Sequence, residues 1–164
     1  MTKKTNKDNG YFLLNVKDTT EFVCNTKNII YGKCRICKKD RLKYVYVLHE
    51  SETLHTTIVC RKCAEKLLDD NITPINIEHA LDKRSKRRND FINSRWIYNP
   101  EKNTYLKKYK DNYIVIKKGI YENWCVIFKN QFYWKYNGRS MQTLNEAQTA
   151  AFYIFEESSN TLFL

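Results

Sequence analysis

The sequence predicts an α+β fold in which two small modules are joined by a basic helical segment. Three observations support it: two Cys-x2-Cys pairs, a basic run in the middle of the chain, and β-rich runs followed by a helix-capping pattern near its end. A chain of 164 residues suits one ordinary domain or two small ones. The expected divisions are a basic N-terminal segment at 1–22, a metal-binding module at 23–72, a basic helix or linker at 73–95, and a sheet-plus-helix domain at 96–164.

The composition narrows the classes of partner and location. The 29 basic and 18 acidic side chains give a formal net charge of +11, which favours an acidic polymer or an anionic surface as partner. Hydrophobic residues make up 42% of the chain, enough for a buried core. No apolar run is long enough to span a bilayer, and the polar N-terminus lacks the apolar stretch of a secretory signal. We therefore expect an intracellular protein, cytoplasmic or nuclear, with no membrane partner.

Four of the six cysteines form two Cys-x2-Cys pairs. Cys34 and Cys37 make the first pair, and Cys60 and Cys63 make the second, with 22 residues between the pairs. Each pair can supply half of a tetrahedral zinc shell, and four thiolates leave no open coordination position. The sequence therefore predicts one structural Zn²⁺. Two disulfides are the alternative, which a reducing compartment disfavours.

The residues around these pairs predict a hairpin and a short helix. Runs at 42–48 and 54–59 are β-rich, with a turn at 50–53 between them, and 64–68 has a helical pattern. Knuckle, hairpin, second knuckle and helix together resemble a treble-clef zinc finger covering about residues 30–70. The remaining cysteines, Cys24 and Cys125, are expected to be small buried hydrophobic residues.

Treble clefs also occur in HNH nucleases, and this segment is similar to them in its order of knuckles and hairpin. That resemblance implies a general-base role for His49. However, Leu48 stands where the family usually has Asp, and Ala64 stands where a metal-binding His or Asn commonly falls. A catalytic ion would then have too few ligands. A divergent nuclease is thus the lesser alternative, and we expect no enzymatic activity.

The middle segment predicts a basic helix. Thr73 and Pro74 form a helix-start signal, with Thr as N-cap and Pro at the first helical position. Basic residues four apart repel one another by about 0.2–0.5 kcal/mol per pair, and an anionic partner would relieve this repulsion. We therefore predict phosphate contacts here, with a solvated linker helix as the alternative. The residues concerned are Lys83, Arg84, Lys86, Arg87 and Arg88.

The last third predicts three strands and a helix. The β-rich runs lie at 113–117, 124–129 and 131–136. Thr143 and Glu146 have the spacing of a capping box. Small and apolar residues at helical spacing then predict a helix lying close on the sheet; these are Ala147, Ala150, Ala151 and Ile154.

The motifs Trp124-x-Val126-x-Phe128, Asn137-Gly138-Arg139 and Thr143-x-x-Glu146-Ala147-x-x-Ala150 carry a second resemblance. Over about 50 residues this region resembles the APETALA-type domain and the arm-binding domain of phage integrases. Those families lay a three-stranded sheet, backed by one helix, in the DNA major groove. Met141 stands where they usually have an aromatic residue. The resemblance implies DNA contacts from the sheet face away from the helix, and the expected contacts are Lys117, Lys129, Lys135 and Arg139.

Together these patterns predict a zinc-stabilised nucleic-acid-binding protein, with DNA favoured over RNA. The abundance of Asn and Lys is typical of AT-rich genomes and favours a phage or viral regulatory factor. The alternative is a viral protein-interaction factor that binds and inhibits or redirects a host protein or nucleoprotein. Small α+β domains serve both purposes, so fold alone does not decide between them.

Overall fold

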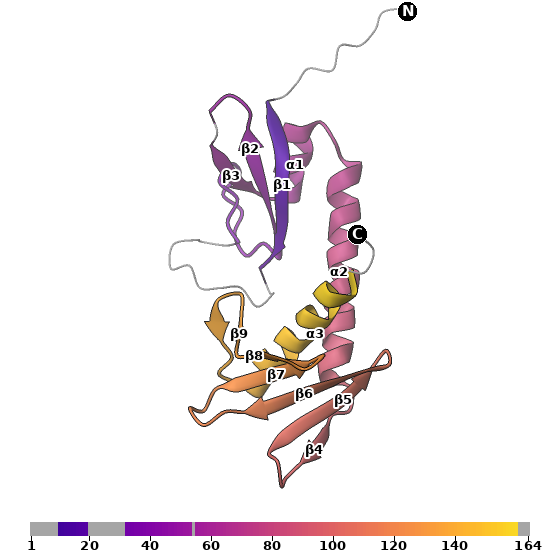
Figure 1. Cartoon of the computed structure of the whole chain (residues 1–164). Helices are drawn as coiled ribbons and strands as arrows, with labels where there is room; N and C mark the ends of the chain where they lie inside the picture. Colours follow the sequence, from indigo (N-terminus) through magenta and orange to yellow (C-terminus); the bar gives the residue numbers. More distant parts are fainter. Residues whose placement is uncertain (1–9, 20–31, 54, 161–164) are drawn as a thin grey trace, which may run out of the picture. The chain divides into compact units, whose positions relative to one another are not determined.

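The computed structural model describes residues 10–19, 32–53 and 55–160 (Figure 1). This part of the chain is mixed α and β, with three helices and antiparallel sheets. It divides into two compact units, the described residues up to 83 (unit 1) and those from 84 onward (unit 2). The predicted joining segment at 73–95 is therefore shared between the units. No helix in the described ranges is both long and apolar enough to cross a membrane.

Unit 1 contains a three-stranded antiparallel sheet in the order β1-β2-β3. Its central strand carries the fully buried side chains of Val45, Tyr46 and Leu48. The predicted hairpin corresponds to β2 and β3, whereas the N-terminal segment, expected only as basic, contributes the edge strand β1. The bounds are β1 Tyr11–Asp18, β2 Tyr44–Glu50, β3 Thr56–Val59, α1 Arg61–Leu68 and α2 Ile72–Asn93.

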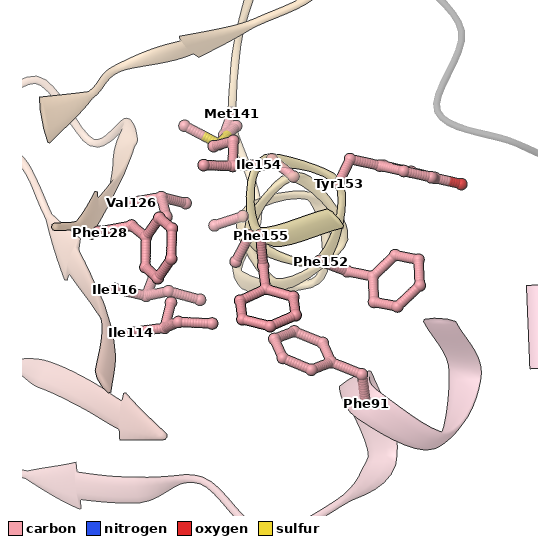
Figure 2. Close-up of a cluster of buried hydrophobic side chains, with 13 residues drawn as sticks. Phe91, Ile114, Ile116, Val126, Phe128, Met141, Phe152, Tyr153, Ile154 and Phe155 are labelled. Carbon is pink, nitrogen blue, oxygen red and sulfur yellow. The ribbon is translucent and has the colours of Figure 1, made fainter. Parts of the chain in front are cut away.

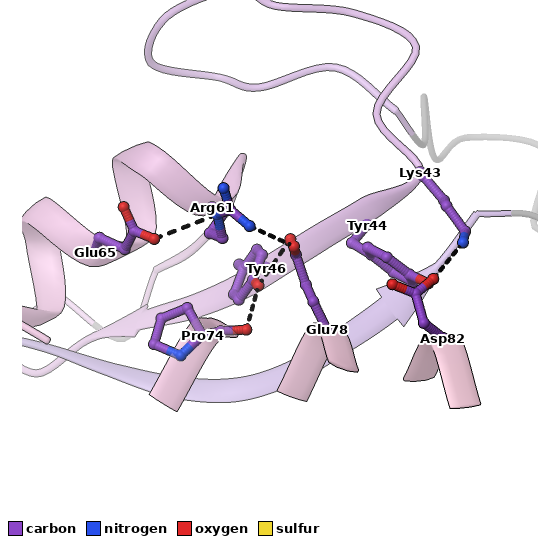
Figure 3. A network of polar contacts seen from close by, with 8 residues as sticks. All are labelled: Lys43, Tyr44, Tyr46, Arg61, Glu65, Pro74, Glu78 and Asp82. Atoms are coloured by element: carbon purple, nitrogen blue, oxygen red, sulfur yellow. Dashed lines mark hydrogen bonds and ion pairs between the residues drawn. The ribbon is translucent and has the colours of Figure 1, made fainter. Parts of the chain in front are cut away.

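The buried hydroxyl of Tyr46 links the sheet of unit 1 to helix α2 through hydrogen bonds. The Tyr46 hydroxyl lies 2.9 Å from the carbonyl oxygen of Pro74 and 3.0 Å from Oε1 of Glu78 (Figure 3). Glu78 also accepts a 2.9 Å hydrogen bond from Arg61, the first residue of α1. Burial, with the Glu78 carboxylate beside it, raises the pKa of Tyr46, so the hydroxyl keeps its proton and remains a donor.

Tyr46→Phe should therefore lower the free energy of unfolding of unit 1 by about 1–2 kcal/mol, because buried acceptors lose their donor. Chemical denaturation followed by the amide signals of β2 measures this change. Tyr121→Phe is the control, because Tyr121 is 88% exposed. Equal stabilities of the two variants would contradict the role given to the hydroxyl.

The start of α2 differs from its prediction. The helix begins at Ile72, and Oδ1 of Asp70 accepts hydrogen bonds from the backbone N–H groups of Ile72 (2.8 Å) and Thr73 (3.1 Å). The prediction of Thr73 as N-cap is therefore wrong. A carboxylate satisfies the free N–H groups and also interacts favourably with the positive end of the helix dipole. Pro74 still lies in the first turn, where its missing N–H costs little.

Unit 2 contains a five-stranded antiparallel sheet in the order β4-β5-β6-β7-β8 and a separate two-stranded hairpin of β9 and β10. The three predicted strands correspond to β6, β7 and β8, but β4 and β5 were not predicted, so the expectation of a three-stranded sheet is corrected to five. The bounds are β4 Ile97–Asn99, β5 Thr104–Tyr109, β6 Asn112–Lys118, β7 Trp124–Phe128, β8 Gln131–Tyr133, β9 Lys135–Tyr136, β10 Arg139–Ser140 and α3 Leu144–Asn160.

Helix α3 covers one face of this sheet and forms the core of unit 2 (Figure 2). The predicted capping box is confirmed: the N–H of Glu146 donates to Oγ1 of Thr143, and the N–H of Thr143 donates to the Glu146 carboxylate, both at 3.1 Å. The predicted small-residue face of the helix is also confirmed, since Ala147, Ala150, Ala151 and Ile154 are all buried.

Candidate metal centre

The first cysteine pair lies in a tight turn before β2. The N–H of Cys34 donates to the carbonyl of Lys39 at 2.7 Å, and the N–H of Lys38 donates back to the carbonyl of Cys34 at 3.0 Å. The N–H of Arg35 donates to the carbonyl of Ile58 at 2.9 Å, which fixes the turn to strand β3. The backbone itself therefore holds the first pair beside the hairpin.

The second pair lies at the beginning of α1. Cys60 is the N-cap residue, and its carbonyl accepts from the N–H groups of Cys63 (3.1 Å) and Ala64 (2.9 Å). The helical turn places the two sulfurs on the same side. Ala64 is fully buried, so this position accommodates a small side chain only.

These two turns bring the four predicted sulfurs together. The Sγ atoms of Cys34, Cys37, Cys60 and Cys63 all lie within 4.8 Å of one another. Sγ of Cys37 is 3.6 Å from Sγ of Cys60, close to the edge of about 3.8 Å in a zinc tetrathiolate and far from the S–S bond of about 2.05 Å in a disulfide. The four cysteines are positioned to bind one metal ion, and a set of four thiolates favours zinc.

The electrostatics of the cluster fit a cation among the sulfurs. Burial raises the pKa of Cys34, but hydrogen bonds from the backbone of Cys37, Cys60 and Ile36 outweigh it and lower that pKa to about 6. In contrast, burial and the neighbouring sulfurs raise the pKa of Cys63 to about 12. Four thiolates at this spacing repel one another, and a divalent cation at their centre offsets that repulsion.

Cationic side chains flank the four cysteines in the two segments that carry them. Five come from the first knuckle and two from α1, and all seven are exposed. None of them lies within ion-pair distance of a carboxylate belonging to the described residues. We call this group the cationic rim; it consists of Lys33, Arg35, Lys38, Lys39, Arg41, Lys62 and Lys66.

The predicted phosphate contacts of α2 fall into two groups. Nε of Arg84 and Nη2 of Arg87 pair with the Glu156 carboxylate at 3.0 and 2.8 Å, and Arg88 is buried and donates to the Tyr153 hydroxyl at 2.9 Å. These three arginines therefore join α2 to α3 within unit 2. The other two residues, Lys83 and Lys86, are exposed, and phosphate contacts by all five residues stay a prediction.

The predicted contacts of the sheet lie on four different elements. Lys117 is exposed on β6 and points to the face opposite the core residues Ile114 and Ile116. Lys129 occupies the β7–β8 turn, where its φ is 49°, whereas Lys135 and Arg139 belong to β9 and β10. The sheet does not gather these four side chains on one face.

The face of the five-stranded sheet that carries Lys117, opposite the core, has a feature that the sequence analysis did not predict. Strand register aligns one apolar residue from each of the five strands in a single cross-strand row. Its outer members, Ile97 and Phe132, are 56% and 63% exposed. The alternation of β6, which buries Ile114 and Ile116 on the other face, is the sequence signal that could have found it. We call this set the apolar row; it consists of Ile97, Leu106, Val115, Ile127 and Phe132.

Two other residues singled out in the sequence lie in the expected elements. His49 lies in β2, and its ring packs against Phe12 with 4.8 Å between centroids. Cys125 is buried, as predicted, whereas Cys24 lies outside the described residues.

The fold and the site define a mixed α/β protein with a four-cysteine metal centre. Comparison with protein-family models, with curated proteins and with solved structures finds no match to this chain. Its function is therefore argued from its own side chains.

Proposed function

We propose that this protein binds nucleic acid, with DNA the favoured form, and that one structural zinc ion holds the binding surface in shape. The cationic rim carries this proposal. In this reading unit 1 is a zinc module of the treble-clef type, because knuckle, hairpin, second knuckle and helix follow in that order. The Asn- and Lys-rich composition supports a phage or viral regulatory role.

The charge around the metal centre stays positive when the metal is counted. A zinc ion with four thiolates carries two negative charges. The rim provides seven positive charges, and the only carboxylate within its knuckle segment, 33–41, is Asp40. Exposed cations grouped on one surface attract phosphates and release counterions on binding. The zinc module, with its two turns, would hold these side chains at fixed positions.

Binding to duplex DNA should weaken as salt rises, and removal of rim charges should reduce that dependence. Lys33→Gln/Arg41→Gln is expected to lower the slope of log affinity against log salt by about two, one for each phosphate that is no longer neutralised. Fluorescence anisotropy from about 50 to 200 mM salt measures the slope. The control, Lys102→Gln/Lys108→Gln, removes the same charge from unit 2.

No binding, an affinity independent of salt, or an equal loss in the control variant would contradict the proposal. An RNA duplex of the same sequence is expected to bind more weakly. We assign the protein no catalytic step. Metal-dependent nicking of DNA that disappears in His49→Ala would show that assignment to be wrong.

The apolar row favours a second candidate function, protein binding. Exposed apolar side chains in a continuous row are characteristic of surfaces that another protein covers. A host protein captured after nuclease treatment by the parent chain, and lost by Ile97→Ser/Phe132→Ser, would support this function. Capture that requires nucleic acid would count against it.

A further inference from the structure

A hollow of about 540 Å³ lies at the metal centre within unit 1, and three of the four cysteines form part of its wall. This volume is in the range of small-molecule sites, about 300–1,000 Å³. Residues of the first knuckle, of the segment leading into β2, of α1 and of α2 contribute to its wall. The lining consists of Cys37, Lys39, Leu42, Lys43, Tyr44, Cys60, Arg61, Lys62, Cys63, Lys66 and Glu78.

Two of the cations in this wall are held in place by carboxylates. Nη1 of Arg61 donates to Oε2 of Glu78 at 2.9 Å, and Nζ of Lys43 pairs with Oδ1 of Asp82 at 2.5 Å (Figure 3). Tyr44 also donates to that same oxygen of Asp82. The positions of these two cations are therefore fixed before any ligand enters.

The other three cations of the wall have no such partner. Among the described residues, no carboxylate lies within ion-pair distance of Lys39, Lys62 or Lys66. Lys62 and Lys66 are four residues apart on α1, so their charges repel one another unless an anion lies between or beside them. These ammonium groups can donate to a ligand without giving up an internal ion pair.

The metal centre does not neutralise the hollow. Arg61 and Lys43 are already balanced by the carboxylates of Glu65, Glu78 and Asp82, but the three positive charges of Lys39, Lys62 and Lys66 still exceed the two negative charges of a zinc tetrathiolate. Three ammonium groups without an ion pair, concentrated in one concavity, suit a compact ligand with several negative charges. Phosphodiesters suit it less well, because they carry one charge each and are spread along a strand.

We propose that this hollow binds a terminal phosphate group, which either a free nucleotide or the 5′ end of a nucleic-acid strand can supply. Lys39, Lys62 and Lys66 donate to the phosphate oxygens, and Arg61 and Lys43 provide fixed positive charge at the wall. Charge-assisted hydrogen bonds of this kind are the strong ones. The inference goes beyond nucleic-acid binding as proposed above, because a free nucleotide alone would satisfy it.

The test uses the zinc-loaded full chain and follows backbone amide shifts during titration with pyrophosphate. Saturable shifts are expected at Lys39, Lys62 and Lys66. The variant Lys62→Gln/Lys66→Gln should weaken pyrophosphate binding about tenfold, because it removes two charge-assisted hydrogen bonds. Lys102→Gln/Lys108→Gln serves as the matched control and should bind as the parent does. Both lysines of the test variant are exposed, so the fold should be retained.

Further titrations separate the two sources of phosphate. Tighter binding of a 5′-phosphorylated oligonucleotide than of its 5′-hydroxyl form would identify the end of a strand as the ligand. Tight binding of ATP, together with equal affinities for the two oligonucleotides, would identify a free nucleotide. Absence of saturable shifts with both pyrophosphate and ATP, or identical binding by the test variant, would overturn the inference. The two proposals fail independently: that result would leave the proposed binding of duplex DNA in place, and a failure to bind duplex DNA would leave the proposed phosphate site in place.

Discussion

Replacement of Cys60 by serine is expected to remove the metal ion and unfold unit 1. Serine is close in size and is a favoured N-cap residue, so the start of α1 should not suffer from the change itself. The change removes one of four thiolate ligands. Structural zinc sites contribute about 10–16 kcal/mol in zinc-finger peptides, as much as the whole stability of a typical domain, about 5–15 kcal/mol. Unit 1 has a small core and should not remain folded without that contribution.

Metal analysis and amide spectra measure this outcome. The parent chain should carry about one zinc ion, as a four-thiolate set predicts, and Cys60→Ser close to none. Signals of β2 should lose their dispersion, and a strong chelator should give the same result with the parent chain. Cys125→Ala is the control, because this cysteine is buried in unit 2, away from the cluster. A Cys60→Ser protein that keeps its zinc, or keeps unit 1 folded without zinc, would rule out the structural role.

The metal centre could be predicted because its geometry is mostly local. A Cys-x2-Cys turn places two sulfurs together whatever the rest of the chain does. Only the approach of the two cysteine pairs to one another depends on tertiary structure, and the β-rich runs between the pairs predicted a hairpin that brings them together. The cationic rim was not predicted from the sequence, because its members, such as Lys38 and Lys66, are far apart in the chain. Only the approach of the first knuckle to α1 places their charges around one centre.

The strands missed in unit 2 lack the usual sequence signals. The β5–β6 turn is Lys110-Asp111 with φ values of 43° and 60°, whereas tight hairpins of this kind usually contain Asn-Gly, as at Asn137-Gly138 between β9 and β10. Within β5, Lys107 occupies a core position and hides the alternation. Its ammonium group donates to Ser94 Oγ at 2.5 Å and lies 4.9 Å from the ring centre of Trp96. A buried lysine held in this way cannot be read from a hydrophobic pattern.

The arginines of α2 show a different limit of sequence reasoning. Spacing on a helix places Arg84 and Arg87 near one another, which suits any anion. It does not reveal whether that anion is an external phosphate or a carboxylate of the same chain. The structure supplies Glu156, 72 residues after Arg84. Such a pairing depends on how α3 packs and has no local signature.

The second large effect is expected in unit 2, where Phe91→Ala should lower the free energy of unfolding by about 3–5 kcal/mol. Phe91 is 1% exposed, and in Figure 2 its ring extends from α2 toward the rings of Phe155 and Phe152. Its ring makes edge contacts with Trp96 (5.5 Å) and Tyr109 (4.9 Å) and a tilted contact with Phe152 (5.7 Å). Alanine would leave a cavity among rigid rings, which cannot easily close around it.

Tryptophan fluorescence follows this unfolding selectively, because all three tryptophans of the chain lie in unit 2. Ile120→Ala, at a side chain that is 96% exposed, should leave the transition unchanged. Zinc content should also stay at the parent level, because the four ligands belong to unit 1. A loss below about 1 kcal/mol would refute the central packing role of Phe91, since fully buried rings cost more to remove. Loss of zinc together with the fluorescence transition would show instead that the units fold as one, through the helix α2 that they share.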